Sequence, residues 1–339
     1  MIRTPRAVLA ALLTVGLAAA VLSPATAGAP VVIDLGSLPR GAPPAVPYLE
    51  GGNAHVLVDG TLRIPVPDNV IGLVGEVGHD YLVWAFANGR DGKEKIFRIS
   101  PDGTKKLVLK ARALYDAQAS PNGSAIATSA IGTTRQTTLK VYDVSTGAVT
   151  RKRTMPGYGT VLDFDGNRVA VGVNNPNKTV TWSLATDTVT KVSSGIGYSV
   201  DLASNRLARF TKDPYAGGCT VVSTFSDPTT ELWTSCRERV EAWSTNGTRI
   251  ATVDALADGL GPGRAWLRKT GGRLLEAYDA PYFFGRLGFE DATHVLMDTY
   301  NRTKYAIVRC DGTTCERASR TGSYDAPLRT ARVPVARPS

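Results

Sequence analysis

Short apolar runs return along this chain at nearly constant intervals, and no stretch shows sustained helical periodicity. Examples are Tyr81–Trp84, Ile126–Thr128, Val169–Val171 and Ile250–Val253. Val, Thr and Tyr recur in such runs, which are bounded by Gly, Pro, Asn and Asp, and this pattern is typical of β-strands joined by turns. The sequence therefore predicts an all-β protein.

Tight turns of the Asp-Gly and Thr-Gly kind recur with the same period as the apolar runs. Gly, Asn and Asp tolerate the positive φ angles that hairpin turns demand. The steps between successive turns are 43, 44, 40, 40, 44 and 41 residues. The second residues of the turns are Gly60, Gly103, Gly147, Asp187, Asp227, Gly271 and Gly312.

Each period holds four predicted strands, here called a, b, c and d, with a longer loop between b and c. Four-stranded units of this length are typical of propeller blades. A single twisted sheet cannot bury both faces, whereas a ring of sheets buries them all. We predict a seven-bladed β-propeller of four-stranded antiparallel blades over residues 44–330. A six-bladed ring with an extra hairpin is the alternative, and a β-sandwich gives no reason for the long period.

The two ends of the ring are the least regular part of the pattern. Six blades, from about Val70 to Ser319, look complete. The hairpin around Gly60 supplies strands c and d of another blade, with Pro47–Glu50 a possible strand b. We predict that residues 324–329 form its innermost strand and close the ring. The alternative is a disordered tail.

Several repeats also carry a family resemblance. The segment Ser120–Ala127, of sequence SPNGSAIA, resembles the repeat of TolB-type, WD40-like propellers, and Phe164–Ala170 and Ser244–Ala251 are similar. Trp182 and Trp266, each five residues before a turn residue, lie where WD40 repeats place the Trp of their Trp-Asp pair. The Gly-His signature of WD40 repeats is missing. The resemblance implies a propeller and often a scaffold or binding role, but no specific activity.

The N-terminus has the pattern of an export signal. Arg3 and Arg6 precede the apolar run Ala7–Leu22, and Ala25-Thr26-Ala27 is a fitting cleavage site. We predict a signal peptide over 1–27, an N-terminal extension over 28–43 and a basic, Pro-containing tail over 331–339. An uncleaved anchor helix is the alternative, although the run is short for a ~30 Å hydrocarbon core. The mature chain is expected to have no membrane span and to reside outside the cell or in the envelope.

The formal net charge is +9, or about +7 without Arg3 and Arg6. Such a surplus predicts a weak attraction to polyanions rather than a specific partner. The positive residues look diffuse, and none of their groups is interleaved with aromatics as a nucleic-acid surface requires. The expected partner is therefore a protein or an anionic cell-envelope polymer, and not nucleic acid.

Four cysteines in an exported chain allow three pairings. Cys219 and Cys236 are symmetric about one predicted hairpin turn, and Cys310 and Cys315 about another. Opposite residues of a hairpin lie within disulfide distance. We predict the bonds Cys219–Cys236 and Cys310–Cys315, whereas a zinc site does not fit the spacing.

No catalytic constellation is visible. The three histidines, His55, His79 and His294, are isolated, and neither a Gly-x-Ser-x-Gly elbow nor a His-Glu-x-x-His segment occurs. Asp163–Asn167 resembles the start of a calcium loop but lacks the distal Glu. We therefore expect no catalytic residue, no metal and no cofactor.

The expected binding face is the one formed by the b–c loops and the d–a connections, which look longer than the other turns. Function tends to reside on loops carried by a rigid scaffold. Five Tyr residues fall where they could encircle the mouth of the channel, with polar residues around them; the alternative is that the Tyr rings pack between blades. We predict a non-catalytic scaffold, and the alternative is a secreted hydrolase or lyase with a site at the channel mouth. The predicted residues are Tyr115, Tyr158, Tyr198, Tyr282 and Tyr324, with Arg90, Arg135, Lys212, Asp213, Arg264 and Arg302.

Overall fold

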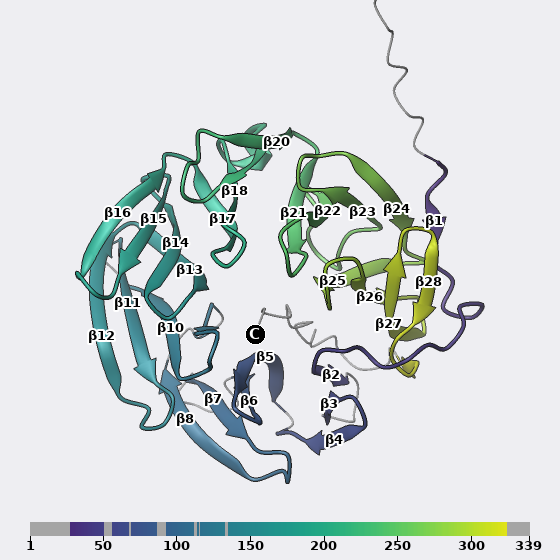
Figure 1. Ribbon diagram of the computed structural model, residues 1–339, viewed down its shortest axis with the longest axis horizontal. Coiled ribbons are helices and arrows are strands. Elements are labelled where there is room, and N and C mark those ends of the chain that lie inside the picture. Colours follow the sequence, from purple (N-terminus) through teal and green to yellow (C-terminus); the bar gives the residue numbers. More distant parts are fainter. Residues whose placement is uncertain are drawn as a thin grey trace, which may run out of the picture.

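Seven β-sheets form a ring in the computed structural model of this protein (Figure 1). The structure describes residues 28–50, 56–67, 69–86, 93–111, 114, 116–132 and 135–323. Within these residues the single helical element is the short 3-10 turn Pro214–Ala216. The predicted all-β, seven-bladed propeller is confirmed, and the six-bladed alternative is wrong.

Six blades consist of four consecutive antiparallel strands, with the first strand innermost. Blade 1 contains β5 (Val70–Val77), β6 (Asp80–Ala85), β7 (Glu94–Ile99) and β8 (Lys105–Ala111). Blade 2 contains β9 (Gln118–Ala119), β10 (Ala125–Ile131), β11 (Gln136–Asp143) and β12 (Val149–Pro156). Blade 3 contains β13 (Tyr158–Phe164), β14 (Arg168–Asn174), β15 (Lys178–Ser183) and β16 (Thr188–Ser193).

The second half of the ring repeats this order. Blade 4 contains β17 (Ile196–Asp201), β18 (Arg206–Phe210), β19 (Thr220–Thr224) and β20 (Glu231–Ser235). Blade 5 contains β21 (Glu238–Trp243), β22 (Arg249–Asp254), β23 (Arg264–Lys269) and β24 (Leu274–Asp279). Blade 6 contains β25 (Phe283–Phe289), β26 (Val295–Tyr300), β27 (Lys304–Asp311) and β28 (Thr314–Arg317), and β29 (Gly322–Ser323) also pairs with β27.

Blade 7 comes from the N-terminal part of the chain. Its described strands are β2 (Tyr48–Glu50), β3 (Val56–Asp59) and β4 (Leu62–Pro65), which match the strands b, c and d that the hairpin around Gly60 predicts. The predicted closing strand, residues 324–329, lies outside the described residues.

A separate apolar cluster fills each interface between neighbouring blades. Of the seven clusters found among the described residues, one joins blades 1 and 2 through Leu82 and Ile126, and another joins blades 7 and 1 through Leu57 and Val83. Each sheet therefore buries both of its faces, which is the physical reason that a repeat of single sheets closes into a ring.

An N-terminal strap follows the outer wall of blades 5 and 6. Strand β1 (Val31–Val32) adds to the outer edge of β24 in blade 5 as a parallel strand, and Ile33 and Leu35 are buried in the cluster between blades 5 and 6. The chain then runs beside β28, where the backbone of Arg317 forms hydrogen bonds with Pro39 and Gly41, before it enters β2 (Figure 1). We call residues 28–47 the strap. Its contacts tie blade 7 to blades 5 and 6.

Both predicted disulfides are confirmed. Cys310 and Cys315 are a cross-strand pair beside the β27–β28 hairpin turn. Cys219 directly precedes β19 and Cys236 directly follows β20, so this bond lies at the end of the hairpin away from its turn. The two bonds therefore stabilise opposite faces of the propeller.

The hairpin of blade 5 differs from the prediction by one residue. Its left-handed residue is Gly272, with φ of 86°, and not Gly271. A Cβ at position 272 would lie 2.0 Å from the Trp233 ring of blade 4, so this close approach also requires glycine. A β-bulge between Leu267 and Arg268 accommodates the longer turn.

The loops that open on the predicted face are uneven in length. Those between β18 and β19 and between β22 and β23 each contain nine residues, 211–219 and 255–263. The expectation of long d–a connections is wrong for most blades, because a single residue, Gly157, separates β12 from β13, and only 194–195 separate β16 from β17. We call the face formed by the b–c loops and the d–a connections the long-loop face.

No described segment forms a helix long and apolar enough to cross a membrane. The predicted signal peptide, residues 1–27, and the predicted tail, residues 331–339, lie outside the described residues.

Candidate binding face and pocket

Exposed apolar side chains gather on the long-loop face. Single exposed apolar residues are normal on any protein surface, so their concentration on one face is the informative observation. Ten large apolar side chains are exposed among the described residues, and three of them, Val32, Leu107 and Val149, lie on edge strands. The remaining seven all belong to connections of the long-loop face or to the strand residues next to them, and none belongs to an a–b or c–d turn. They are Phe86, Ile131, Tyr158, Tyr215, Leu256, Leu260 and Tyr282.

The disulfide Cys219–Cys236 stabilises the base of the first long loop, residues 211–219. The amide of Cys219 donates to Thr211 Oγ1 at 3.0 Å, and Asp213 caps the 3-10 turn that follows by accepting a hydrogen bond from the Tyr215 amide. Tyr215 itself is 68% exposed. The loop thus presents an aromatic ring to solvent from an anchored base.

The second long loop, residues 255–263, is ordered by contacts from three blades. Arg239 of β21 donates through Nη1 to the carbonyl oxygens of Asp254, Ala255 and Ala257. From blade 4, Tyr215 Oη donates to Asp258 Oδ2 at 2.9 Å. The amide of Phe284 in blade 6 donates to the carbonyl of Pro262 at 2.8 Å.

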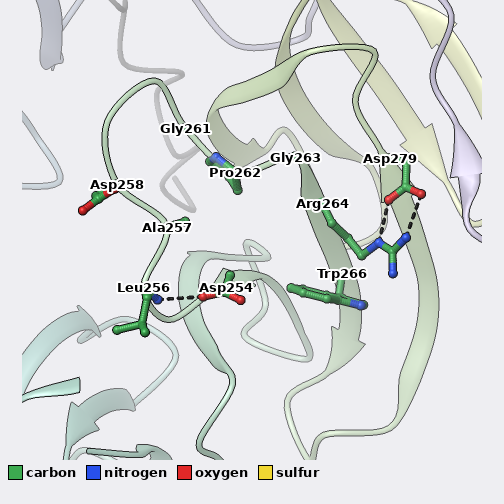
Figure 2. A pocket seen from close by; sticks show the side chains of 10 residues that line it. All are labelled: Asp254, Leu256, Ala257, Asp258, Gly261, Pro262, Gly263, Arg264, Trp266 and Asp279. Atoms are coloured by element: carbon green, nitrogen blue, oxygen red, sulfur yellow. Dashed lines mark hydrogen bonds and ion pairs between the residues drawn. The ribbon is translucent and has the colours of Figure 1, made fainter. Parts of the chain in front are cut away.

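A pocket of about 670 Å³ opens beside this second loop (Figure 2). It is lined by residues of blade 5 alone, and the Trp266 ring lies at its base beside Asp254, as Figure 2 shows. The lining residues are Asp254, Leu256, Ala257, Asp258, Gly261, Pro262, Gly263, Arg264, Trp266 and Asp279. We call it the blade-5 pocket.

Trp266 reaches this pocket because of its register. The sequence places it at the same repeat position as Trp182, which lies opposite Val169 in blade 3. Ile250 of blade 5 is the equivalent of Val169, and it lies opposite Arg268 rather than Trp266. The residue of blade 5 that corresponds to Trp182 is therefore Arg268, and the predicted position of Trp266 is wrong by two residues. Trp266 is correspondingly closer to the b–c loop, where its ring lines the pocket.

The pocket has an excess of carboxylates although the chain as a whole is basic. Arg264 and Asp279 satisfy each other through two hydrogen bonds of 2.6 and 2.8 Å, and this pairing raises the pKa of the guanidinium. Asp254 Oδ1 accepts a hydrogen bond from the Leu256 amide, and Asp258 accepts one from the Tyr215 hydroxyl. Asp254 therefore lies beside the indole ring, whereas Asp258 points away from that ring (Figure 2). The one cation among the lining residues, Arg264, is paired with Asp279, so the lining keeps a negative charge that favours a positively charged group.

The predicted site residues are only partly brought together. Arg264 lines the blade-5 pocket, and Tyr158 and Tyr282 are exposed on the long-loop face. Tyr198 stacks on Phe210, and its hydroxyl accepts a hydrogen bond from the Val240 amide of blade 5. This ring therefore packs between blades, as the alternative for the Tyr residues predicts. On the same face Arg135, Lys212, Asp213 and Arg302 are exposed. Tyr115, Tyr324 and Arg90 lie outside the described residues.

Of the residues that form the pocket, the sequence predicted only Arg264 as a site residue. Asp254 and Asp258 belong to a segment that the sequence shows only as a loop rich in Gly, and the signal was the apolar Leu256 and Leu260 within it. Apolar side chains in a polar loop have no core to enter, and such residues are candidates for contact with a partner.

A cluster of titratable groups on the opposite face is explained by the fold. Glu290, Asp291 and His294 offer ligand atoms within 4.8 Å of one another, but Glu290 is paired with Arg309 and accepts the Ala45 amide of the strap. Burial opposes the ionisation of Asp291, yet the hydrogen bonds from His294 and Thr293 lower its pKa to about 2. This group lies at the β25–β26 turn, on the face opposite the long loops.

Comparison with known proteins places the chain by fold. No family model and no curated protein matches the sequence. Among solved structures, Pyrococcus horikoshii acylaminoacyl peptidase matches with a TM-score of 0.58 and 11% identity, over 78% of this chain and 47% of that one. The chain thus spans about half of that peptidase.

Two further matches correspond to the resemblance found in the repeats. The WD40 repeats of RRP9 match with a TM-score of 0.50 and 11% identity, over 82% of this chain and 84% of that one. TolB from Acinetobacter baumannii matches with a TM-score of 0.46 and 13% identity, over 68% of this chain and 65% of that one. The match to the WD40 repeats of RRP9 confirms the predicted WD40-like propeller as a fold, and such low identities show nothing beyond it.

Proposed function

We propose that this chain is an exported, non-catalytic propeller that binds a polypeptide partner on its long-loop face. The observation that carries the proposal is the gathering of exposed aromatic and aliphatic side chains on that face, on blades 1 to 5 and at the start of blade 6. Aromatic anchors amid polar residues are typical of protein interfaces. A surface that extends over several blades suits a polypeptide better than a small molecule.

The blade-5 pocket would receive a cationic side chain of that partner. Asp254 supplies the negative charge and Trp266 an aromatic surface for an ammonium or guanidinium group. Tyr215 and Tyr282 lie on the neighbouring blades on either side and would contact the polypeptide next to that residue.

Export is supported by the two disulfides, which persist in oxidising compartments. It is also supported by the sequence of residues 1–27, which has the three parts of a signal peptide. The face available to a partner would then operate outside the cytoplasm.

The hydrolase alternative receives less support from the pocket. The lining residues include no His, Ser, Cys or Lys, so a catalytic site there would have to work with Asp side chains alone. Asp258 and Asp279 are each held by a side-chain partner. The peptidase activity belongs to a protein of which this chain matches about half at 11% identity.

The test compares two double variants of the mature chain in a pull-down from the envelope fraction of its host. Tyr215→Ala/Leu260→Ala removes two exposed side chains of the long-loop face, and Leu107→Ala/Val149→Ala removes two exposed ones from outermost strands. We expect the first to reduce capture of a partner by about tenfold or more, because interface anchors contribute ≥ ~2 kcal/mol. The second should bind as the wild type does. Equal capture by both variants, or no capture by the wild type, would overturn the proposal.

A further inference from the structure

Two neighbouring blades carry most of the positive charge of the outer wall. The outermost strands of the seven blades contain nine Lys and Arg residues, and six of these lie on β8 and β12, which contain no Asp or Glu. Figure 1 shows β8 and β12 side by side on the rim. The cations of the outermost strands are therefore concentrated on two blades, because strands one repeat apart in sequence become neighbours in the ring. The six residues are Lys105, Lys106, Lys110, Arg151, Lys152 and Arg153.

Several of these cations lie directly opposite another cation. Lys152 pairs in register with Lys140 of β11, and Lys106 pairs with Arg98 of β7. Like charges opposite each other on one sheet face are destabilising. The charge of Arg98 is met by Asp80 at 2.5 Å, whereas neither Lys140 nor Lys152 forms an ion pair with another described residue.

The register directs the blade 2 cations toward blade 1. Tyr142 packs in the cluster between blades 1 and 2, and Lys140, two residues earlier on the same strand, shares its side. Lys152 lies opposite Lys140 and therefore faces blade 1 as well.

The register likewise directs the blade 1 cations toward blade 2. Leu82 packs in the same cluster, Arg98 lies opposite Leu82, and Lys106 lies opposite Arg98. Lys106 Nζ reaches across to the carbonyl of Ser145, in the β11–β12 turn of blade 2, at 3.2 Å. We call Arg98, Lys106, Lys140 and Lys152 the basic seam.

We propose that the basic seam binds a linear phosphate polymer along the outer edge of blades 1 and 2. Packed sheets lie ~10 Å apart, close to the ~8 Å Debye length at physiological ionic strength, so the positive potentials of the two blades overlap. Lys106 and Lys152 are exposed, and their ammonium groups act as point charges that suit successive phosphates. The seam lies on the outer wall and not on the long-loop face, so this second binding surface is independent of the proposed polypeptide site.

The primary experiment measures the affinity of the mature protein for long-chain inorganic polyphosphate at low and high salt. The seam variant is Lys106→Gln/Lys140→Gln/Lys152→Gln. The control, Lys191→Gln/Lys269→Gln/Lys304→Gln, removes the same charge from blades 3, 5 and 6. We expect salt-sensitive binding by the wild type and the control, and a Kd raised by about tenfold or more in the seam variant because three phosphate contacts are lost. Equal weakening in both variants would show attraction to net charge alone and overturn the proposal, as would undiminished binding by the seam variant.

Thermal unfolding gives a second readout. Without ligand, the seam variant should unfold at a temperature no lower than the wild type, because it lacks the repulsion between Lys140 and Lys152. Polyphosphate should raise the unfolding temperature of the wild type and of the control, but not that of the seam variant. Equal stabilisation of all three proteins would contradict a site at the seam.

Discussion

The hydroxyl of Tyr215 donates a hydrogen bond of 2.9 Å to the carboxylate of Asp258, and this contact joins the longest loops of blades 4 and 5. The two residues are 43 apart in sequence, one repeat period, and lie at corresponding places in their blades. The bond therefore makes two separate loops into one surface and orients one of the carboxylates of the blade-5 pocket.

The phenol of Tyr215 should titrate later than an ordinary exposed tyrosine. The hydrogen bond to Asp258, and then the charge of that carboxylate, raise its pKa above the usual 10.0. The difference in phenolate absorbance between the wild type and Tyr215→Phe should therefore develop above pH 10. In Asp258→Asn the titration of Tyr215 should move down toward the ordinary value. If both proteins titrate alike, the bond does not persist in solution.

The strap should contribute strongly to stability through two side chains. Ile33 and Leu35 are 0% and 2% exposed in the cluster between blades 5 and 6. Ile33→Ala and Leu35→Ala should each lower the free energy of unfolding by about 2–4 kcal/mol, measured by chemical denaturation. Val32→Ala is the matched control, since Val32 is 71% exposed, and should change stability by less than about 0.5 kcal/mol. Comparable losses at all three positions would contradict the buried packing of the strap.

Loss of the Cys219–Cys236 bond should be more costly than loss of Cys310–Cys315. The bonds join residues 17 and 5 apart, and the chain-entropy estimate gives about 3 and about 2 kcal/mol respectively. Paired Cys→Ser variants, unfolded in denaturant under oxidising conditions, should show this order. Only the first pair should also increase amide exchange in residues 211–219, because it stabilises the base of that loop. The reverse order of stability would show that strain or packing outweighs loop entropy here.

Asp298 should make stability depend on pH. Burial raises the pKa of this carboxyl from 3.8 to about 7, although Arg286 acts in the opposite direction. Between these pH values the unfolded chain releases a proton that the folded protein keeps, so the free energy of unfolding should fall as the pH rises from about 4 to about 7. Asp298→Asn should remove this slope and be more stable than the wild type above pH 7. The neighbouring variant Met297→Leu should keep the wild-type slope; an unchanged slope in Asp298→Asn would place the titration elsewhere.

The blade pattern was predictable because it is local. Turn residues such as Gly103 and Gly147 need a left-handed backbone, and glycine records that need in the sequence. Cys310 and Cys315 face each other because a hairpin brings symmetric residues together, which spacing alone reveals. The role of the strap was not predictable in this way, since Ile33 and Leu35 are buried against blades more than 200 residues away.

The candidate surfaces were harder to predict because they depend on register and on neighbours in the ring. Trp266 lines the pocket since a longer hairpin and a bulge shift it by two residues, and turn spacing did not show that shift. Lys106 and Lys152 belong to segments 46 residues apart, and only ring packing directs them into one seam.

The sequence by itself determined the elements of this protein: four strands per period, seven periods and two hairpin disulfides, because each depends on residues close together in the chain. The tertiary structure decided which side chains meet, because the packing of each sheet against the next selects which loops join, as Tyr215 joins Asp258, and which charges converge, as Lys106 and Lys152 do.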